Sequence, residues 1–155
     1  MLSIVVPTLN NFKGCVETLE SVRTKHRWEP IIFPQFRANR VISATWNEGI
    51  EIGLSRGSKY ILIINDDILF ARHTIDNMVE FFENAPEDIL LVSACNDKGN
   101  IDATYGSPYG VFEMPKTEVD MNNYAEHPDF SNFLIDGRLF EYAGKFDENF
   151  IPAYY

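Results

Sequence analysis

The stretch KYILIINDDILF, residues 59–70, decides the fold class, because an unbroken apolar run ends there in three polar residues. Residues 60–64 are rich in β-branched side chains and lack polar alternation, which is typical of a strand buried on both faces of a parallel sheet. Asn65, Asp66 and Asp67 follow at its carboxyl end. Ligands of open α/β sheets bind beyond the carboxyl ends of the strands, so the stretch predicts both a parallel sheet and a candidate site.

Strands and helices alternate on either side of this stretch. Short apolar runs predict further strands at residues 2–7, 31–33, 88–95 and 131–135. Apolar residues at helical spacing predict helices at residues 12–22, 41–54 and 74–82, with a short helix at 138–142. We therefore expect an α/β fold.

Prolines, glycines and one threonine refine these expectations. Pro30 and Pro34 bracket the second strand, which favours an edge position because proline cannot donate to a ladder. Gly49 and Gly53 lie on the apolar face of the second helix and predict close backbone packing there. Thr74 is the expected N-cap of the third helix.

The composition excludes some classes of function. With 155 residues, 45% of them hydrophobic, the chain is expected to form one domain with a substantial core. Its 13 Lys and Arg against 23 Asp and Glu give a net charge of −10, which repels nucleic acid and anionic lipid. An acidic protein that binds an anionic ligand needs a bridging cation or a local basic patch.

The cysteines and the N-terminus bear on location. Cys15 and Cys95 are far apart and lack the spacing of a zinc site, so we expect buried free thiols. The sequence contains neither a signal peptide nor an apolar run long enough for a transmembrane segment. A cytoplasmic location is the default expectation.

Asp66 and Asp67 are the strongest candidates for chemistry. An aspartate pair in an arbitrary chain is usually a turn that ends a strand. Here the pair follows a strongly apolar strand, and the Ile68, Leu69 and Phe70 that come next are poor turn residues. Adjacent like charges are stabilised by a cation, and carboxylate oxygens suit Mg²⁺ or Mn²⁺. The pair therefore favours a divalent metal site, with a plain turn as the alternative.

Three blocks of sequence extend this interpretation to the whole chain. They are SIVVPTLNN at residues 3–11, WNEGIEIGLSRGSKYILIINDDILF at residues 46–70 and FLIDGRLFEYAGKFDENFIPAYY at residues 133–155. In this order they resemble the GT-A-type nucleotide-sugar glycosyltransferases, in particular inverting family two with its cellulose-synthase and rhamnosyltransferase relatives. The resemblance implies a Rossmann-like three-layer α/β/α sandwich with a mostly parallel central sheet. It implies one domain over residues 1–155, with a nucleotide-sugar-binding half at 1–96 and an acceptor-side half at 97–155.

The same resemblance implies roles for individual residues. Asn65, Asp66 and Asp67 stand at the family's DxD motif, which makes Asp67 the ligand of Mn²⁺ or Mg²⁺ and leaves Asn65 or Asp66 to face the ribose or the diphosphate. The further residues that match nucleotide-binding positions are Pro7, Thr8, Asn10 and Asn47. The residues that match the GxFDE block, with a largely structural part on the acceptor side, are Gly144, Phe146, Asp147 and Glu148.

The implied activity is metal-dependent, inverting transfer of a sugar from a nucleotide-diphosphate donor, UDP-sugar first, to a glycan, lipid-linked or protein acceptor. The family's aromatic stretch leads into an ED-type motif that carries the general base, whereas this sequence ends at Tyr155. We therefore expect a truncated or minimal version whose general base is unassigned. Asp129 and Asp136 lie in the right half of the chain but match a loop and a strand-end turn better. A nucleotide-sugar or glycan binding module and a sugar-phosphate nucleotidyltransferase are the alternatives.

Overall fold

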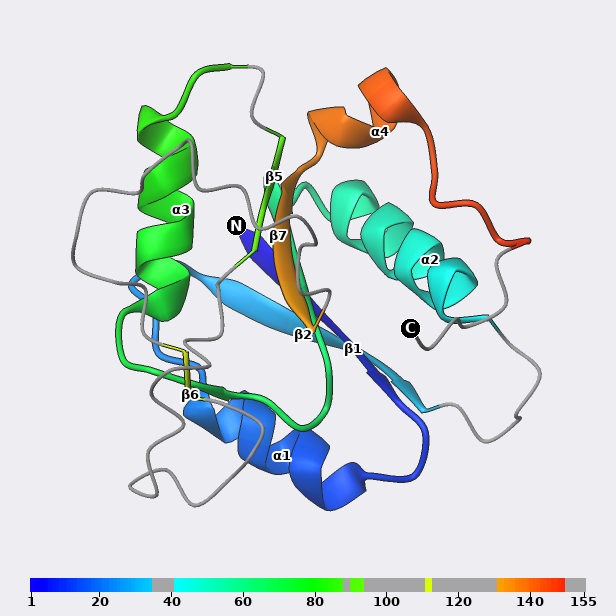
Figure 1. Ribbon diagram of the computed structural model, residues 1–155, viewed down its shortest axis with the longest axis vertical. Helices are drawn as coiled ribbons and strands as arrows, with labels where there is room; N and C mark the ends of the chain where they lie inside the picture. The colour runs from blue at the N-terminus through cyan, green and yellow to red at the C-terminus, as the bar shows by residue number, and fades with distance from the viewer. Residues whose placement is uncertain (35–40, 88–89, 94–110, 113–130, 150–155) are drawn as a thin grey trace.

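A mostly parallel sheet forms the centre of the molecule (Figure 1). The structure, a computed structural model, describes residues 1–34, 41–87, 90–93, 111–112 and 131–149. Five described strands form the sheet in the order β2-β1-β3-β7-β5. Their bounds are Leu2–Thr8 for β1, Trp28–Pro34 for β2, Tyr60–Ile64 for β3, Leu91–Val92 for β5 and Asn132–Asp136 for β7. Strand β1 pairs in parallel with β2 and β3, and β7 runs antiparallel to β3 and β5.

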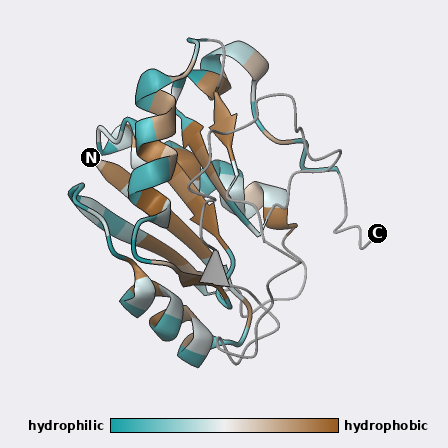
Figure 2. Cartoon of the chain, turned by 60° about the vertical axis from the view of Figure 1, so that its left-hand side comes forward, coloured by the Kyte–Doolittle hydropathy of each residue, from teal (hydrophilic) through white to brown (hydrophobic). Residues whose placement is uncertain are grey.

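Helices cover both faces of this sheet. Helices α1 (Phe12–Ser21) and α3 (Thr74–Asn84) pack on one face, and α2 (Ile42–Ser55) and α4 (Arg138–Ala143) pack on the other. The alternation of side chains along each strand supplies two cores, so that Ile4 on β1 joins the first core and Val5 joins the second. Figure 2 shows the apolar strands between helices with hydrophilic outer surfaces. The predicted three-layer α/β/α sandwich with a mostly parallel sheet is confirmed.

Two local predictions need correction. The expected fourth strand at 88–95 is too long, because β5 covers only Leu91–Val92 and leaves out Leu90 and Ser93, while residues 88–89 and 94–95 lie outside the described part of the chain. Thr74 is not the N-cap of α3: His73 occupies that position without a capping side-chain bond, and Thr74 is the buried first residue of the helix. The amide of Thr74 donates to Ala71 O at 3.2 Å, so the chain turns just before the helix begins.

A small second sheet was not predicted. Strand β4 (Leu69–Phe70) pairs in parallel with β6 (Val111–Phe112). Strand β4 belongs to the apolar run that directly follows the acidic pair and that argued against a plain turn there. Ile68 and Phe70 of this run are buried.

Strand β2 is an edge strand, as the flanking prolines predicted. The amide of Leu2 donates to Arg27 O at 3.0 Å, and alternate residues of a strand face the same neighbour. Residues 29, 31 and 33 therefore turn their backbone groups to β1, whereas Pro30 and Pro34 turn theirs to the open edge. At these two positions the edge has no backbone N–H group that could donate a hydrogen bond to another strand.

Glycines let α2 lie close to the sheet, as the sequence indicated. A Cβ atom on Gly49 would lie 2.4 Å from Cγ1 and 2.9 Å from Cγ2 of Val5. A Cβ atom on Gly53 would lie 2.8 Å from Cδ1 of Ile61 and 3.0 Å from Cβ of Ser3. The two glycines thus fix the spacing between α2 and strands β1 and β3.

Cys15 is a buried free thiol, as expected, and Cys95 lies outside the described residues. Burial raises the pKa of the Cys15 thiol, and the negative charge of Asp66 raises it further. No helix in the described part of the chain is long and apolar enough to cross a membrane.

We expect Gly49→Ala to lower the free energy of unfolding by about 1–3 kcal/mol, because the new methyl group overpacks against Val5. An ordinary Gly→Ala change inside a helix has the opposite sign. Urea denaturation measures the loss, and Ser55→Ala, an exposed change on the same helix, should stay within about 0.5 kcal/mol of the wild type. In the Val5→Ala background the Gly49→Ala loss should shrink, and an undiminished loss there would contradict the proposed contact.

Candidate functional site

The strands β1 and β3 end at the same edge of the sheet, where a cavity of about 620 Å³ opens. The residues that line it are Pro7, Thr8, Leu9, Asn10, Asn11, Ile42, Asn65, Asp66 and Asp67. Apart from Ile42 at the start of α2, they come from the end of β1, the loop that follows it and the acidic loop after β3. All the residues that the sequence predicted to bind nucleotide or metal line this cavity, except Asn47.

The cavity lining combines hydroxyl, amide and carboxylate groups. Thr8 is only 1% exposed, and its Oγ1 is buried without a hydrogen-bond partner among the described residues. Asn10, Asn65 and Asp67 are exposed, and Asp66 is half-buried. Buried hydroxyls are normally paired, so Thr8 Oγ1 is an exception among the described residues that line the cavity.

The carboxylates of this site suit a divalent cation of the magnesium type. Magnesium sites commonly use one or two protein carboxylates, with phosphate and water oxygens completing the shell. Asp66 and Asp67 provide such a pair at the mouth of the cavity. Within the described ranges, no three His, Cys, Asp or Glu side chains are grouped so that they could hold a metal ion. Two neighbouring carboxylates match the number that the protein supplies in such a site.

Asn11 joins the two loops, and sequence reasoning missed it. Its Nδ2 donates to Asp66 O at 3.0 Å, and its Oδ1 accepts from Gly14 N at 3.1 Å. The second bond caps α1, and an asparagine just before a helix is a recognisable capping signal. The first bond spans 55 residues, and no local pattern predicts it.

Asn47 serves a different part of the molecule. It is 2% exposed, its Nδ2 donates to Phe146 O at 2.9 Å and to Glu148 Oε1 at 2.8 Å, and its Oδ1 accepts from Phe146 N at 3.0 Å. These bonds hold the GxFDE block against α2. They agree with the largely structural part expected for that block.

An aromatic cluster supports the same block. The ring centroid of Phe146 lies 5.4 Å from that of Trp46 and 5.9 Å from that of Phe133, and the rings of Trp46 and Phe133 are 5.2 Å apart. All three contacts are edge-to-face, the arrangement that aromatic quadrupoles favour. Gly144, the first residue of this block, caps the end of α4 with a φ of +81°, a conformation that suits glycine.

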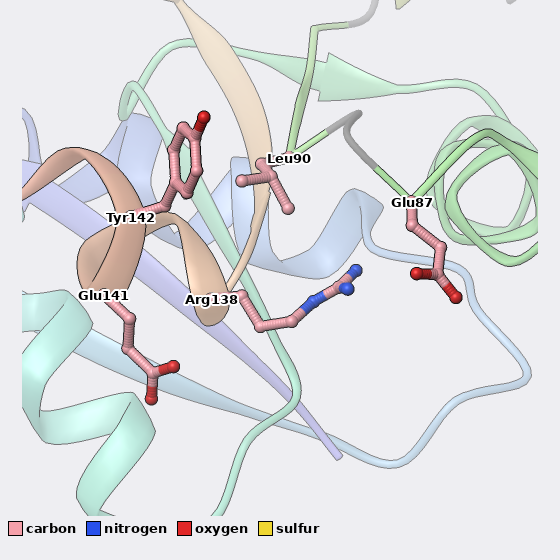
Figure 3. Close-up of a pocket in the computed structure, with 5 residues that line it drawn as sticks. All are labelled: Glu87, Leu90, Arg138, Glu141 and Tyr142. Carbon is pink, nitrogen blue, oxygen red and sulfur yellow. The ribbon is translucent and has the colours of Figure 1, made fainter.

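A second cavity of about 390 Å³ lies at the opposite end of the sheet (Figure 3). Its described lining residues are Glu87, Leu90, Arg138, Glu141 and Tyr142. Arg138 Nε and Nη2 donate to the buried Asp136 carboxylate at 3.0 and 3.1 Å, and Asp136 pairs with Tyr60 at the start of β3. Asp136 is therefore a strand-end residue remote from the acidic loop, while Asp129 lies outside the described residues.

The fold is shared with two solved structures. The mannosyltransferase PcManGT from Pyrobaculum calidifontis, in complex with GDP-Man and Mn²⁺, matches with a TM-score of 0.59 and 15% identity over 96% of this chain and 48% of that chain. S. aureus TarS 1–349 matches with a TM-score of 0.62 and 17% identity over 98% of this chain and 52% of that chain. A scan against protein-family models and a search of curated proteins each found no match.

These likenesses define the class of fold. The chain has a Rossmann-like α/β fold like that of the mannosyltransferase, and it spans about half the length of each matching protein. The expected likeness to glycosyltransferases is confirmed at the level of the fold. Membership of the inverting family two stays a prediction.

We expect Asn47→Ala to lower the free energy of unfolding by about 2–4 kcal/mol, because the backbone amide and carbonyl of Phe146 lose their partner. Urea denaturation measures this loss. Asn149→Ala removes an exposed side chain from the same segment and should change the free energy by no more than about 0.5 kcal/mol. Equal losses in the two variants would contradict the role of Asn47.

The stability of the protein should also depend on Asp136 at low pH. Burial alone would raise the pKa of Asp136, but hydrogen bonds from the side chain and amide of Arg138 outweigh it and hold the pKa below its ordinary value. Since the folded pKa is the lower one, the stabilisation is complete above the unfolded pKa of about 3.9 and is lost as the pH falls through the folded pKa.

Asp136→Asn should therefore cost about 1–3 kcal/mol at pH 7 and make stability less dependent on pH in the acid range. Urea denaturation between neutral and acid pH tests this. Glu80→Gln removes one exposed carboxylate outside the network and is the charge-matched control. An Asp136→Asn slope that equals the wild-type slope would exclude the proposed pairing effect.

Proposed function

We propose that the chain binds a nucleoside-diphosphate sugar in the cavity at the ends of β1 and β3 and transfers the sugar, with inversion, to an acceptor hydroxyl. One observation carries the proposal: two segments that the sequence singled out separately, at residues 7–10 and 65–67, line one cavity. Its volume of about 620 Å³ lies within the range of small-molecule sites. The fold shared with a mannosyltransferase solved with GDP-Man and Mn²⁺ supports the donor class.

Charge supports a divalent cation as part of the proposed site. The protein carries a net charge of −10, and Asp66 and Asp67 add two carboxylates to the cavity lining. A diphosphate next to these groups is repelled unless a cation lies between them. Asp67 would hold Mn²⁺ or Mg²⁺, and the bound ion would supply Lewis-acid stabilisation of the charge on the departing diphosphate.

The other residues of the cavity would orient the donor. Asn65 and Asp66 would face the ribose or the diphosphate, and Thr8 and Asn10 with Pro7 would contact the base and ribose. Of these residues, Thr8 is also the one whose hydroxyl oxygen is buried and has no partner within the described residues, so a bound nucleotide would have to rearrange its surroundings to contact that oxygen. Asn47 would act on the donor only through the segment that it holds. UDP is the first nucleotide to test, and GDP is the second.

The proposal predicts metal-dependent nucleotide binding. Mn²⁺ should tighten the binding of UDP or GDP by about tenfold or more, because it neutralises the repulsion from Asp66 and Asp67. Asp67→Asn should abolish this gain, whereas Glu80→Gln, which also removes one carboxylate but lies on α3, should preserve it. Calorimetric titration of each protein with and without Mn²⁺ measures the effect. A gain that survives Asp67→Asn would refute the metal assignment.

Turnover is a separate measurement, since the chain spans about half the length of its structural neighbours. The protein is incubated with UDP- and GDP-sugars, and the released nucleoside diphosphate is measured. Release through hydrolysis or transfer of the sugar supports the enzyme function. Metal-dependent binding without any release supports a nucleotide-sugar binding module instead.

A further inference from the structure

We propose that Asn11 is a positioning residue that couples the binding of the nucleotide to the binding of the metal. The proposal rests on the proposed function and adds a residue to it. Asn11 lies at the end of the loop after β1, and its side chain reaches the loop that carries Asp67.

The orientation of the Asn11 carboxamide is fixed by its partners. The amide of Gly14 can only donate, so the carboxamide oxygen must face it, at 3.1 Å. The carbonyl of Asp66 can only accept, so the carboxamide nitrogen must face it, at 3.0 Å. A flipped side chain would lose both bonds. The planar amide thus ties the start of α1 to the acidic loop in one geometry.

The bond to Asp66 acts directly on the proposed metal ligand. The carbonyl of Asp66 and the amide of Asp67 belong to one planar peptide unit, so a bond to the carbonyl orients that unit and the start of Asp67. The amide of Asn65 donates to Ser131 O at 2.8 Å, which anchors the other end of the loop. The position of Asp67 therefore depends on Asn11 on one side and on the sheet on the other.

Close packing at Gly14 strengthens the link. A Cβ atom on Gly14 would lie 2.4 Å from the backbone oxygen of Asp66, so only glycine lets α1 lie this close to the acidic loop. Residues 7–10, which would hold the base and ribose, immediately precede Asn11. A nucleotide that orders these residues would therefore also order the loop that holds the metal, and linkage requires the reverse effect to be equal.

Asn11→Asp and Asn11→Ser separate this role from simple helix capping. Both variants keep an oxygen that can cap α1, since Asp and Ser are good N-caps. The Asp carboxylate has no donor, and the Ser hydroxyl ends one bond short of the carboxamide nitrogen that donates to Asp66 O. We expect unchanged thermal stability in both. The coupling factor, defined as the ratio of UDP dissociation constants without and with Mn²⁺, should fall by about threefold to tenfold. Asn11→Ser carries no added charge and so controls for the charge of Asn11→Asp.

A ligand-free measurement completes the test. Backbone ¹⁵N relaxation should report increased motion of residues 65–68 in both variants, with α1 unchanged. Wild-type coupling that persists in both variants, with unchanged relaxation, would overturn the role of Asn11 and leave the proposed function standing. If the wild type binds no nucleotide in the presence of Mn²⁺, both the proposed function and the proposed coupling fail. The relaxation result then describes only the contact between Asn11 and the acidic loop.

Discussion

Parallel pairing of β1 with β3 is the constraint on which the rest of the structure depends. Val5 pairs with Ile63, and both strands are buried on both faces, so a slip of one residue would exchange the side chains that fill the two cores. Packing in the two cores therefore favours this register. Because the strands are parallel, their carboxyl ends meet, and the loops that follow Thr8 and Ile64 have to share one edge of the sheet.

Small residues then determine how closely the helices approach this edge. Gly49 and Gly53 bring α2 onto the central strands, and Gly14 brings the start of α1 against the acidic loop. The nearest neighbours of Gly49 and Gly53 are side chains on the buried strands β1 and β3, which cannot move without disturbing a core. The neighbours of Gly14 are the Asn11 side chain and the backbone oxygen of Asp66. The geometry of the cavity is thus set by helix docking as well as by the sheet. The loops that line it are held by the elements from which they start.

Local chemistry explains which parts of this arrangement could be predicted from the sequence. Some elements could be predicted because their signals involve only residues that are close in sequence. These signals are the helical periodicity of α1 and α2, the apolar runs of β1 and β3 and the edge prolines of β2. The antiparallel direction of β7 between β3 and β5 could not be predicted, because a buried strand has the same pattern whichever way it runs. The partners of Asn47 lie about one hundred residues away, and the bond from Asn11 to Asp66 is similarly non-local. Side chains whose role is defined by a distant partner leave no periodic signal.

The composition of the acidic loop bears on how the proposed site would work. Asn65 stands where the resemblance implies an aspartate, so the loop offers one negative charge fewer to a cation. A neutral amide oxygen attracts Mn²⁺ less strongly than a carboxylate does, and the phosphate oxygens of a bound nucleotide would then supply much of the attraction. Weak binding of the ion by the protein alone would make the joint binding of ion and nucleotide the favoured event. In such a site the geometry between the two loops matters more than the number of carboxylates, because each ligand completes the binding surface of the other.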